Sequence, residues 1–495
     1  MGQAERAWLF RFAERLSGAI CTPGLWVVVV VLGLSARCYQ YFGNPSYWYD
    51  EAFLVRGVID LSFSELIGPL PARTIVPPVF LWLLRLCYIT FGAQEWSLRL
   101  PAFIASIGAL ALMIPLARRW LGSPGWMWAV GFCALSTHCI HHAFEVRPYA
   151  TDFLATTILL WLAQVFLAAC DTTSRRQAGA GLLTTSAVVP WLSFPAIFVL
   201  FAVCVTLFIH YLKKRDGRRL AFWFCYSSVF LLSSFIVWYI QARHLYYPGL
   251  KNEWTYVWGG FPKDYSAQTL MLWTALTPER VAHYASTGLG IPLVILGLAG
   301  LIRCWRRSME EISLLFGPPV FAYAAALLGK YPLADRTLLF LAPVVWLVAA
   351  EGLLYLMERG YRAKVVVPIL AFGLMIPGMA ISVQHCIRVR PRMEYREALT
   401  YVLERRGENE AVWNWCPDLN YVYVEHIFLD CPSKYASDPV EPLGAARAAN
   451  KGPLWVIAPN NQVENMTESL RSLPLQRSLC HQFFDVQVLR FDPRP

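Results

Sequence analysis

Long apolar runs alternate with short polar segments along most of the chain. A transmembrane helix needs about 17–25 predominantly apolar residues. Eleven runs fit this requirement, at residues 20–42, 99–117, 124–142, 151–170, 180–195, 196–212, 220–241, 288–302, 312–329, 336–357 and 365–386. The boundary within 180–212 is the least regular, because Pro190 and Pro195 break or kink a helix there. The pattern predicts a polytopic α-helical membrane protein with about eleven spans.

The basic residues indicate how these spans are oriented. Lysine and arginine are enriched in the cytoplasmic loops of membrane proteins. Basic clusters occupy the N-terminus and alternate connections between the predicted spans, so they all fall on one side of the membrane. We therefore expect the N-terminus in the cytoplasm and three segments on the outer face: residues 43–98, residues 242–287 and the tail from residue 388.

The first two outer segments have patterns of their own. Within residues 52–68 the apolar positions share one helical face, and Arg56 and Asp60 are spaced to pair four residues apart, which is typical of an interfacial helix. The apolar stretch 76–92 is not counted as a span, because doing so would move the next basic loop to the outer face. The loop 242–287 is rich in aromatic residues, which favours an interfacial belt or a cover for a sugar.

The tail is more polar and carries short strand-like runs. The expected strands are Ala411–Trp415, Pro453–Ala458 and Val486–Phe491, and the expected helices are Tyr395–Arg405 and Val463–Leu470. We therefore divide the chain into a membrane domain, residues 1–387, and a small outer α/β domain, residues 388–495. The tail holds three cysteines, Cys416, Cys431 and Cys480, which allow one disulfide and leave one thiol over.

Composition supports a membrane location. Of 495 residues, 57% are hydrophobic and 15% are Asp, Glu, Lys or Arg, whereas soluble domains average about 45–50% apolar and about 25% charged. The net charge of +10 is explained by the basic loops, so nucleic acid is not an expected partner. The chain has no P-loop, no G-x-G-x-x-G and no G-x-S-x-G, so neither a nucleotide donor nor a hydrolase nucleophile is indicated.

Ionisable residues gather at the outer ends of the predicted spans. One cluster is Asp50-Glu51, after the first span, and a second surrounds Glu145, Arg147 and Asp152. A third contains Lys330, Asp335 and Arg336. Any single charge at a helix end is most simply explained by contact with water, but three clusters at one depth favour a functional site.

Each cluster suggests its own chemistry. A carboxylate such as Asp50 among aromatic residues suits a general base. Lys330 and Arg336 suit a phosphate, since arginine offers a fork and lysine a point charge. His138 and His142 lie one turn apart, as do His141 and Glu145, which leaves a metal site open, although the order H-E-x-x-H is absent.

The order of these motifs resembles the GT-C class of membrane glycosyltransferases, in particular the bacterial branch of glycosyltransferase family 39. That family type includes protein O-mannosyltransferases and the lipid A aminoarabinose transferase. The resemblance covers residues 40–345. It rests on five features: Asp50-Glu51; the proline-rich segment with Pro69, Pro71, Pro77 and Pro78; Phe91-Gly92 with Glu95 to Pro101; Glu145 to Ala150; and Tyr331-Pro332 through Arg336 to Pro343.

This resemblance implies transfer of a sugar from a polyprenyl-phosphate carrier to an acceptor hydroxyl on the outer face of a bacterial inner membrane. It implies that Asp50 is the base, and that Glu51 orients the acceptor or helps to hold a cation. It assigns the second acidic position to Glu145, with Asp152 as its rival, because family members often carry an aspartate in that region. The carrier phosphate is assigned to Arg147, Lys330 and Arg336, with Tyr149, Tyr331 and Asp152 as further substrate contacts.

Several alternatives stay open at this level. The residues identify no specific cofactor, and a divalent metal held by Asp50, Glu145 or His142 is compatible with them. The acceptor is a lipid, a glycan or a protein. The competing functions are a multi-span transporter, which usually shows repeats and ionisable groups near the midplane, and a membrane-tethered assembly protein or ligase of cell-envelope glycan synthesis.

Overall fold

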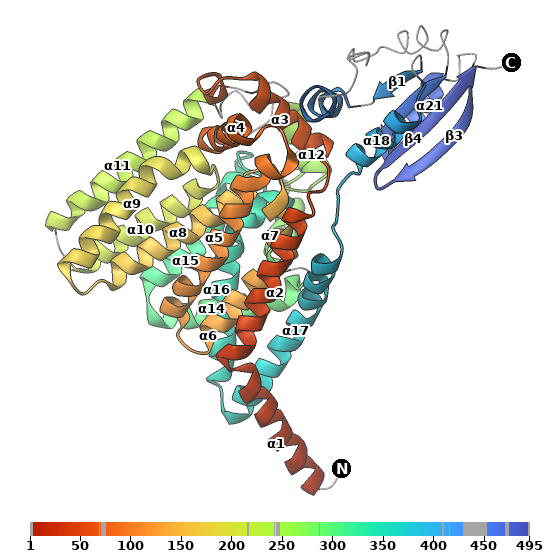
Figure 1. Ribbon diagram of the computed structural model, residues 1–495. Coiled ribbons are helices and arrows are strands. Elements are labelled where there is room, and N and C mark those ends of the chain that lie inside the picture. Colours follow the sequence, from red (N-terminus) through yellow and green to blue (C-terminus); the bar gives the residue numbers. More distant parts are fainter. Residues whose placement is uncertain are drawn as a thin grey trace.

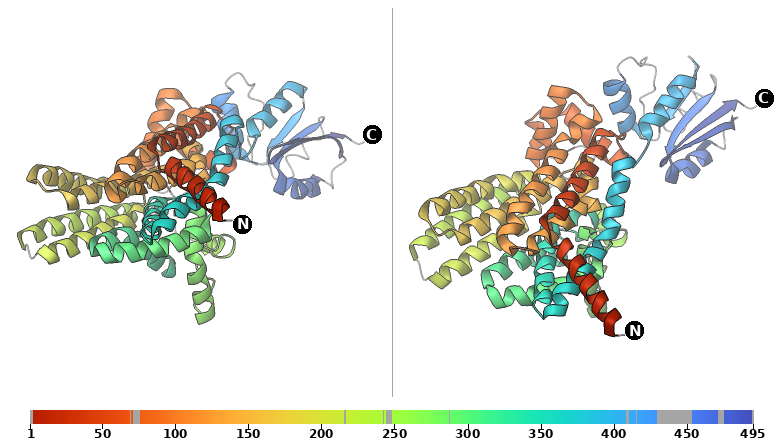
Figure 2. Two further views of the ribbon diagram at one scale, coloured as in Figure 1. Left: turned by 90° about the horizontal axis from the view of Figure 1, so that it is seen from below. Right: turned by 60° about the horizontal axis from the view of Figure 1, so that its bottom comes forward.

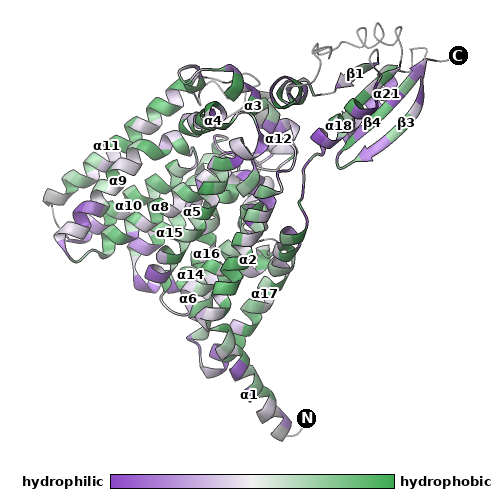
Figure 3. Ribbon diagram, viewed as in Figure 1, coloured by the Kyte–Doolittle hydropathy of each residue, from purple (hydrophilic) through white to green (hydrophobic). Residues whose placement is uncertain are grey.

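Helices build most of the chain, and a small sheet lies near its C-terminus (Figure 1). The computed structural model describes residues 3–68, 70, 76–214, 217–241, 243, 248–286, 288–407, 410–414, 416–428, 453–470 and 475–493. Of the residues named above, Pro69, Pro71, Trp415 and Cys431 lie outside these ranges. The long helices are hydrophobic along most of their length, whereas strand β3 (Leu475–Phe483) is largely hydrophilic (Figure 3).

Seven of the described helical segments are long and apolar enough to cross a membrane. They are α2 (Pro23–Phe42), α5 (Glu95–Leu121), α8 (Tyr149–Ala168), α10 (Ala196–Lys214), α11 (Gly217–Ile240), the segment Asp335–Met357 formed by η5 (Asp335–Leu341) and α16 (Ala342–Met357), and α17 (Tyr361–Ile387). Helices α13 (Ala267–Ser286) and α14 (Gly290–Arg307) form an eighth if they are one span bent by 107°.

Among the described residues, seven or eight of the eleven predicted spans therefore meet the criteria of length and composition, and every predicted range is largely helical. The other predicted ranges correspond to α6 (Gly125–Leu135), α9 (Thr172–Leu192) and α15 (Met309–Leu327). Helix α6 has only 11 residues, α9 begins with a polar turn that contains Arg175 and Arg176, and α15 begins with Glu310 and Glu311. All three pack within the bundle, as Figure 1 shows.

The predicted span 124–142 is interrupted by a break at Ser136, between α6 and α7 (Thr137–His141). A broken helix inside a membrane leaves carbonyl groups that need donors. The fully buried Arg37 of α2 supplies them, because its guanidinium donates to the carbonyl oxygens of Cys133, at 3.0 Å, and Ala134, at 2.9 Å. Arg37 stands within the predicted span 20–42, but the sequence does not show these partners, which explain how α6 can end within the bundle.

Close helix packing completes the bundle. A Cβ atom at Gly352 of α16 would clash with the carbonyl oxygen of Leu296 on α14, and one at Gly300 would clash with that of Val348. Small residues at such contacts let membrane helices approach closely. Helix α1 (Gln3–Ile20) projects from the end of the bundle opposite α3 (Figure 1).

The first outer segment folds as short helices. They are α3 (Tyr49–Asp60), η1 (Glu65–Ile67) and α4 (Pro78–Phe91). Val55 and Val58 of α3 are fully buried, and Arg56 pairs with Asp60 at 3.5 Å, as the spacing predicted. The apolar helix α4 has 14 residues, fewer than a span needs. In the aromatic loop, α12 (Pro248–Tyr256) precedes α13, Trp258 is exposed and Phe261 is buried.

The C-terminal region is a four-stranded sheet with short helices. Its elements are α18 (Tyr395–Arg405), β1 (Ala411–Asn414), α19 (Pro417–Asn420), η6 (Tyr421–Ile427), β2 (Leu454–Pro459), η7 (Asn460–Gln462), α21 (Val463–Leu470), β3 and β4 (Val486–Pro493). The strand order is β1-β2-β4-β3, with β1 and β2 parallel and the other pairs antiparallel. The three predicted strands and two predicted helices are confirmed. Of the tail cysteines described, Cys416 and Cys480 are both free.

Strand β3 was not expected from the sequence, because most of its side chains are exposed and polar. It lies at the edge of the sheet, where one neighbour, β4, supplies all its strand pairing. In both views of Figure 2 the strands lie on one side of the bundle, and α9, α10 and α11 lie on the other. One hydrophobic cluster nevertheless joins the C-terminal region to the first outer segment, and it includes Tyr47, Phe80, Tyr395, Tyr423 and Trp455.

Candidate functional site

Asp50 lies between two arginines from distant parts of the chain. Its Oδ1 is 2.5 Å from Nη2 of Arg147, and its Oδ2 is 2.7 Å from Nη1 of Arg336. Arg147 also donates to the backbone carbonyl oxygen of Asp50. The side chains of Asp50 and Arg336 are each 21% exposed, so the group is accessible from outside, while that of Arg147 is 7% exposed. The structure thus brings together one predicted carboxylate and two predicted phosphate-binding cations.

Local backbone structure places these groups. Asp50 is in the first turn of α3, where the helix dipole favours an acidic side chain. Arg147 lies in the turn before α8, and Arg336 follows Asp335, whose φ of 49° is in the left-handed region. Asn44, before α3, also has a positive φ, of 44°. Such conformations are uncommon outside glycine and cluster at functional sites.

Glu51 is committed to contacts within the protein. Its carboxylate lies 2.7 Å from Nη2 of Arg99 and accepts a 2.7 Å hydrogen bond from the N–H of Val146. Glu51 is 1% and Arg99 2% exposed. Arg99 also donates to the carbonyl oxygens of Pro45 and Ser46. This pair therefore fixes the start of α3 against α5 and against the turn that carries Arg147.

Glu145 forms a second buried polar group next to the first. Its Oε2 is 2.5 Å from Nδ1 of His142, and the other ring nitrogen of His142 is 2.6 Å from the hydroxyl of Tyr284. The Glu145 Oε1 atom lies 3.1 Å from Nη1 of Arg392. Burial alone would raise the pKa of Glu145, but Arg392 and His142 outweigh it and hold the pKa well below its usual range.

The histidines have partners other than a metal ion. Both ring nitrogens of His142 are occupied by Glu145 and Tyr284. His138 stacks on Tyr284 with ring centroids 3.9 Å apart, and His141 receives a 2.6 Å hydrogen bond from Nε of Arg392. A metal ion at the predicted ligands would have to replace these contacts.

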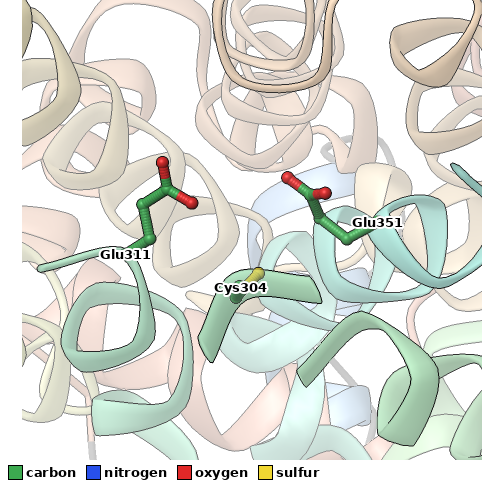
Figure 4. Close-up of side chains that lie close together, drawn as sticks. All are labelled: Cys304, Glu311 and Glu351. Carbon is green, nitrogen blue, oxygen red and sulfur yellow. The ribbon is translucent and has the colours of Figure 1, made fainter. Parts of the chain in front are cut away.

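Three potential metal-ligating groups do converge elsewhere, at Cys304, Glu311 and Glu351 (Figure 4). Arg303 and Arg307 both bind the carboxylate of Glu351, and Arg307 also pairs with Glu311 at 2.5 Å. These residues are called the far-end cluster below, because they lie at the other end of the η5–α16 segment from Arg336. They form an internally neutralised set of ion pairs. Glu351 lies about 25 Å from Arg336 along the η5–α16 segment, given a rise of about 2.0 Å per residue in the 3₁₀-helix and about 1.5 Å in the α-helix.

The remaining residues that were predicted to contact substrate do not all lie beside Asp50. The ring of Tyr149 lies 5.9 Å from the guanidinium carbon of Arg336 and 4.8 Å from the ring of His142, inside the site. Tyr331 instead packs on Phe198, and its hydroxyl donates to the carbonyl oxygen of Thr337. Asp152 is buried on α8 beside Ser193. Lys330 is exposed in the loop before η5.

Two residues beside Asp50 carry buried polar atoms without a hydrogen-bond partner. Among the described residues with such atoms, Trp48 precedes the Asp50 helix and has an unpaired Nε1, and Arg147 has an unpaired Nε. Most buried polar atoms in folded proteins are hydrogen-bonded, so such exceptions call for an explanation. An adjacent small pocket is lined by Trp48, Glu51, Arg99, His141, Glu145 and Arg392, together with Pro45, Ser46 and Phe144.

Sequence reasoning missed three residues of this site. Arg99 carried a signal, because it lies in the segment Glu95 to Pro101 on which the resemblance rests, but the sequence assigned it no role. Tyr284 and Arg392 carried none, because each reaches the site only through the path of the chain from α13 or from the connection after α17. Their contacts depend on tertiary structure that a sequence pattern does not encode.

Comparison with known proteins identifies the fold. No protein-family model matches the chain, and no curated protein sequence matches it. Among solved structures, ArnT from Cupriavidus metallidurans bound to undecaprenyl phosphate matches with a TM-score of 0.56 and 12% identity, over 94% of this chain and 97% of ArnT. The apo form of that ArnT matches with a TM-score of 0.55.

A second membrane glycosyltransferase supports the same assignment. The apo oligosaccharyltransferase of Archaeoglobus fulgidus matches with a TM-score of 0.51 and 12% identity, over 91% of this chain and 71% of that enzyme. The apolar helices and these neighbours show an integral multi-pass membrane protein. The chain has the GT-C fold of these glycosyltransferases, which confirms the resemblance found in the sequence.

Proposed function

We propose that this protein transfers a sugar from a polyprenyl-phosphate donor to an acceptor hydroxyl at the outer face of a bacterial inner membrane. The observation that carries the proposal is the placement of Asp50 between Arg147 and Arg336. One carboxylate beside two permanent cations supplies a base and an anion site within a few ångströms. The ArnT structure with undecaprenyl phosphate gives a lipid phosphate of this kind as a ligand of the same fold.

The proposed reaction needs few protein groups. The acceptor oxygen attacks the anomeric carbon and loses its proton to Asp50, while the bond from that carbon to the phosphate oxygen breaks. The polyprenyl phosphate leaves as an anion, so it needs cations rather than a general acid. Arg147 and Arg336 fill this role, and arginine forks suit phosphate oxygens.

Asp50 and the donor phosphate compete for the same two arginines in this scheme. In the structure the carboxylate of Asp50 pairs with both guanidinium groups, and the three side chains together keep a net charge of +1. A bound phosphate draws those groups to itself and leaves Asp50 free to accept a proton. Tyr149, beside Arg336, lines the same space and is the proposed substrate contact.

The other predicted residues have different parts in this proposal. Both oxygens of Glu51 are bound by the protein, so we assign it to positioning the start of α3 rather than to contact with the acceptor. Glu145 holds the adjacent turn and His142. We assign Lys330, at the exposed loop, to attraction of the anionic headgroup, and Tyr331 to packing.

Donor consumption tests the proposal directly. Purified protein is incubated with a panel of undecaprenyl-phosphate sugars, with and without bacterial membrane extract as a source of acceptor, and the lipids are followed by mass spectrometry. We expect wild type to consume one sugar-lipid and Asp50→Asn to be slower by about 10²–10⁴-fold, the usual contribution of a general base. Equal consumption by folded Asp50→Asn would remove Asp50 as the base, and no consumption by wild type under either condition would contradict the function.

A further inference from the structure

We propose that Arg392 is a positioning residue of this site, contributed by the connection that leads from the membrane bundle to the C-terminal sheet. The proposal rests on the proposed function, because it concerns the same reaction. Arg392 lies in residues 388–394, between α17 and α18, outside every motif that pointed to the site. Its side chain is 29% exposed, so it borders the site at the outer surface.

Arg392 links three parts of the site through one guanidinium group. Nη1 is 3.1 Å from Oε1 of Glu145, and Nε donates to the ring of His141 at 2.6 Å. The guanidinium carbon lies 4.3 Å from the ring centre of Trp48, which is a cation–π distance. Trp48 is the N-cap of α3, so the side chain that holds Glu145 also packs against the residue from which the Asp50 helix begins.

The positive charge of Arg392 compensates the buried carboxylate of Glu145. Glu145 is 3% exposed, and a buried carboxylate is costly unless a cation and hydrogen bonds compensate it. His142 provides positive charge only when protonated, whereas arginine is always charged. Arg392 therefore keeps Glu145 ionised and oriented, and Glu145 in turn holds His142.

The connection that carries Arg392 is itself held against the site. Oγ of Ser46 donates to the carbonyl oxygen of Met393 at 2.5 Å and accepts from the N–H of Tyr395 at 3.1 Å. Arg396, one turn further on, pairs with the buried Glu95 at 2.9 Å. Arg392 is thus fixed at both its backbone and its guanidinium, as accurate positioning requires.

A positioning role predicts an effect on turnover and none on donor binding. Arg392 contacts neither Asp50, Arg147 nor Arg336 directly, so the proposed phosphate site stays intact when it is replaced. Loss of its contacts lets Trp48 and Glu145 shift, and a misplacement of about 1 Å can cost on the order of 10²-fold in rate. The Arg392→Lys variant keeps the charge but loses the fork, so partial recovery is expected.

The experiment compares Arg392→Met, Arg392→Lys and Arg390→Met with wild type. Arg390 is the matched control, because it is in the same connection but is exposed and contacts Gln384. We measure kcat and KM for the sugar-lipid that wild type consumes, and binding of undecaprenyl phosphate by native mass spectrometry. The expected result is a kcat about 10²-fold lower for Arg392→Met, an intermediate kcat for Arg392→Lys, a wild-type kcat for Arg390→Met, and unchanged binding throughout.

Two results overturn the proposal: a wild-type kcat in Arg392→Met, or a parallel loss of undecaprenyl-phosphate binding. If Arg392→Met does not fold, Arg392→Lys decides by the same two measurements. A failure of the proposed function is separate and visible beforehand, since wild type would then consume no sugar-lipid.

Discussion

Two clusters of ionisable side chains in this protein each contain a carboxylate held by two arginines. They differ in how completely their polar atoms are buried and hydrogen-bonded. In the far-end cluster, Glu351 is fully buried and both its oxygens are held by Arg303 and Arg307. In the cluster around Asp50, this carboxylate is also held by two arginines but remains 21% exposed, beside buried polar atoms that lack partners. A closed, matched cluster joins helices, whereas an open one with unmatched atoms can exchange its partners for a ligand.

The largest effect that separates the two clusters is on stability. Glu351 holds two guanidinium groups, and each hydrogen bond to a charged group contributes about 1.5–3 kcal/mol, so loss of its charge costs about 3 kcal/mol or more, although Arg303 and Arg307 keep Glu358 and Glu311 as partners. We expect Glu351→Gln to lower the free energy of unfolding by that amount, measured by denaturant unfolding in detergent, with unchanged kcat per folded molecule. The matched control is Glu358→Gln, since Glu358 also pairs with Arg303 but is 58% exposed. Equal stability of the two variants would contradict a joining role for Glu351.

The next effect is on donor binding. A hydrogen bond to a charged group contributes about 1.5–3 kcal/mol, which corresponds to about 10–150-fold in affinity. We expect Arg336→Met to weaken binding of undecaprenyl phosphate by this factor, measured by native mass spectrometry, and to leave the fold intact. Arg306→Met, an exposed arginine near the far-end cluster, is the control and should bind like wild type. Unchanged binding in Arg336→Met would move the phosphate site elsewhere.

The sequence predicts which residues belong to the Asp50 cluster better than it predicts their arrangement. Apolar periodicity and motif order identified Asp50, Arg147 and Arg336, because charges near a membrane stand out against apolar runs. The contact between Asp50 and Arg336 joins residues 286 apart in sequence, and no local pattern encodes such a distance. Tyr331 shows the converse, because it belongs to a site motif and yet packs into the bundle.

The fold likewise has some features that a local sequence pattern predicts and others that depend on tertiary contacts. Helices were found because their hydrophobic runs are long, and the tail strands because β-branched residues recur in them. Three predicted spans do not meet the criteria of length and composition, because broken or partly polar helices such as α6 are sheltered inside the bundle. Arg37, which supports the end of α6, was missed because a charge in a span is tolerated only through contacts that the sequence does not display.

The smallest effect tests whether the open cluster really exchanges partners. If Asp50 competes with the donor phosphate for Arg147 and Arg336, then Asp50→Asn should bind undecaprenyl phosphate more tightly while it loses turnover. Partly exposed ion pairs contribute about 0.2–1 kcal/mol, so the expected gain in affinity is at most about fivefold. The control is Asp335→Asn, which removes the same charge next to Arg336 and keeps a residue that tolerates the positive φ at this position. An equal gain in both variants would indicate only a general loss of negative charge, whereas a gain confined to Asp50→Asn would show that the base and the donor share their cations, so that donor binding itself prepares Asp50 to accept a proton.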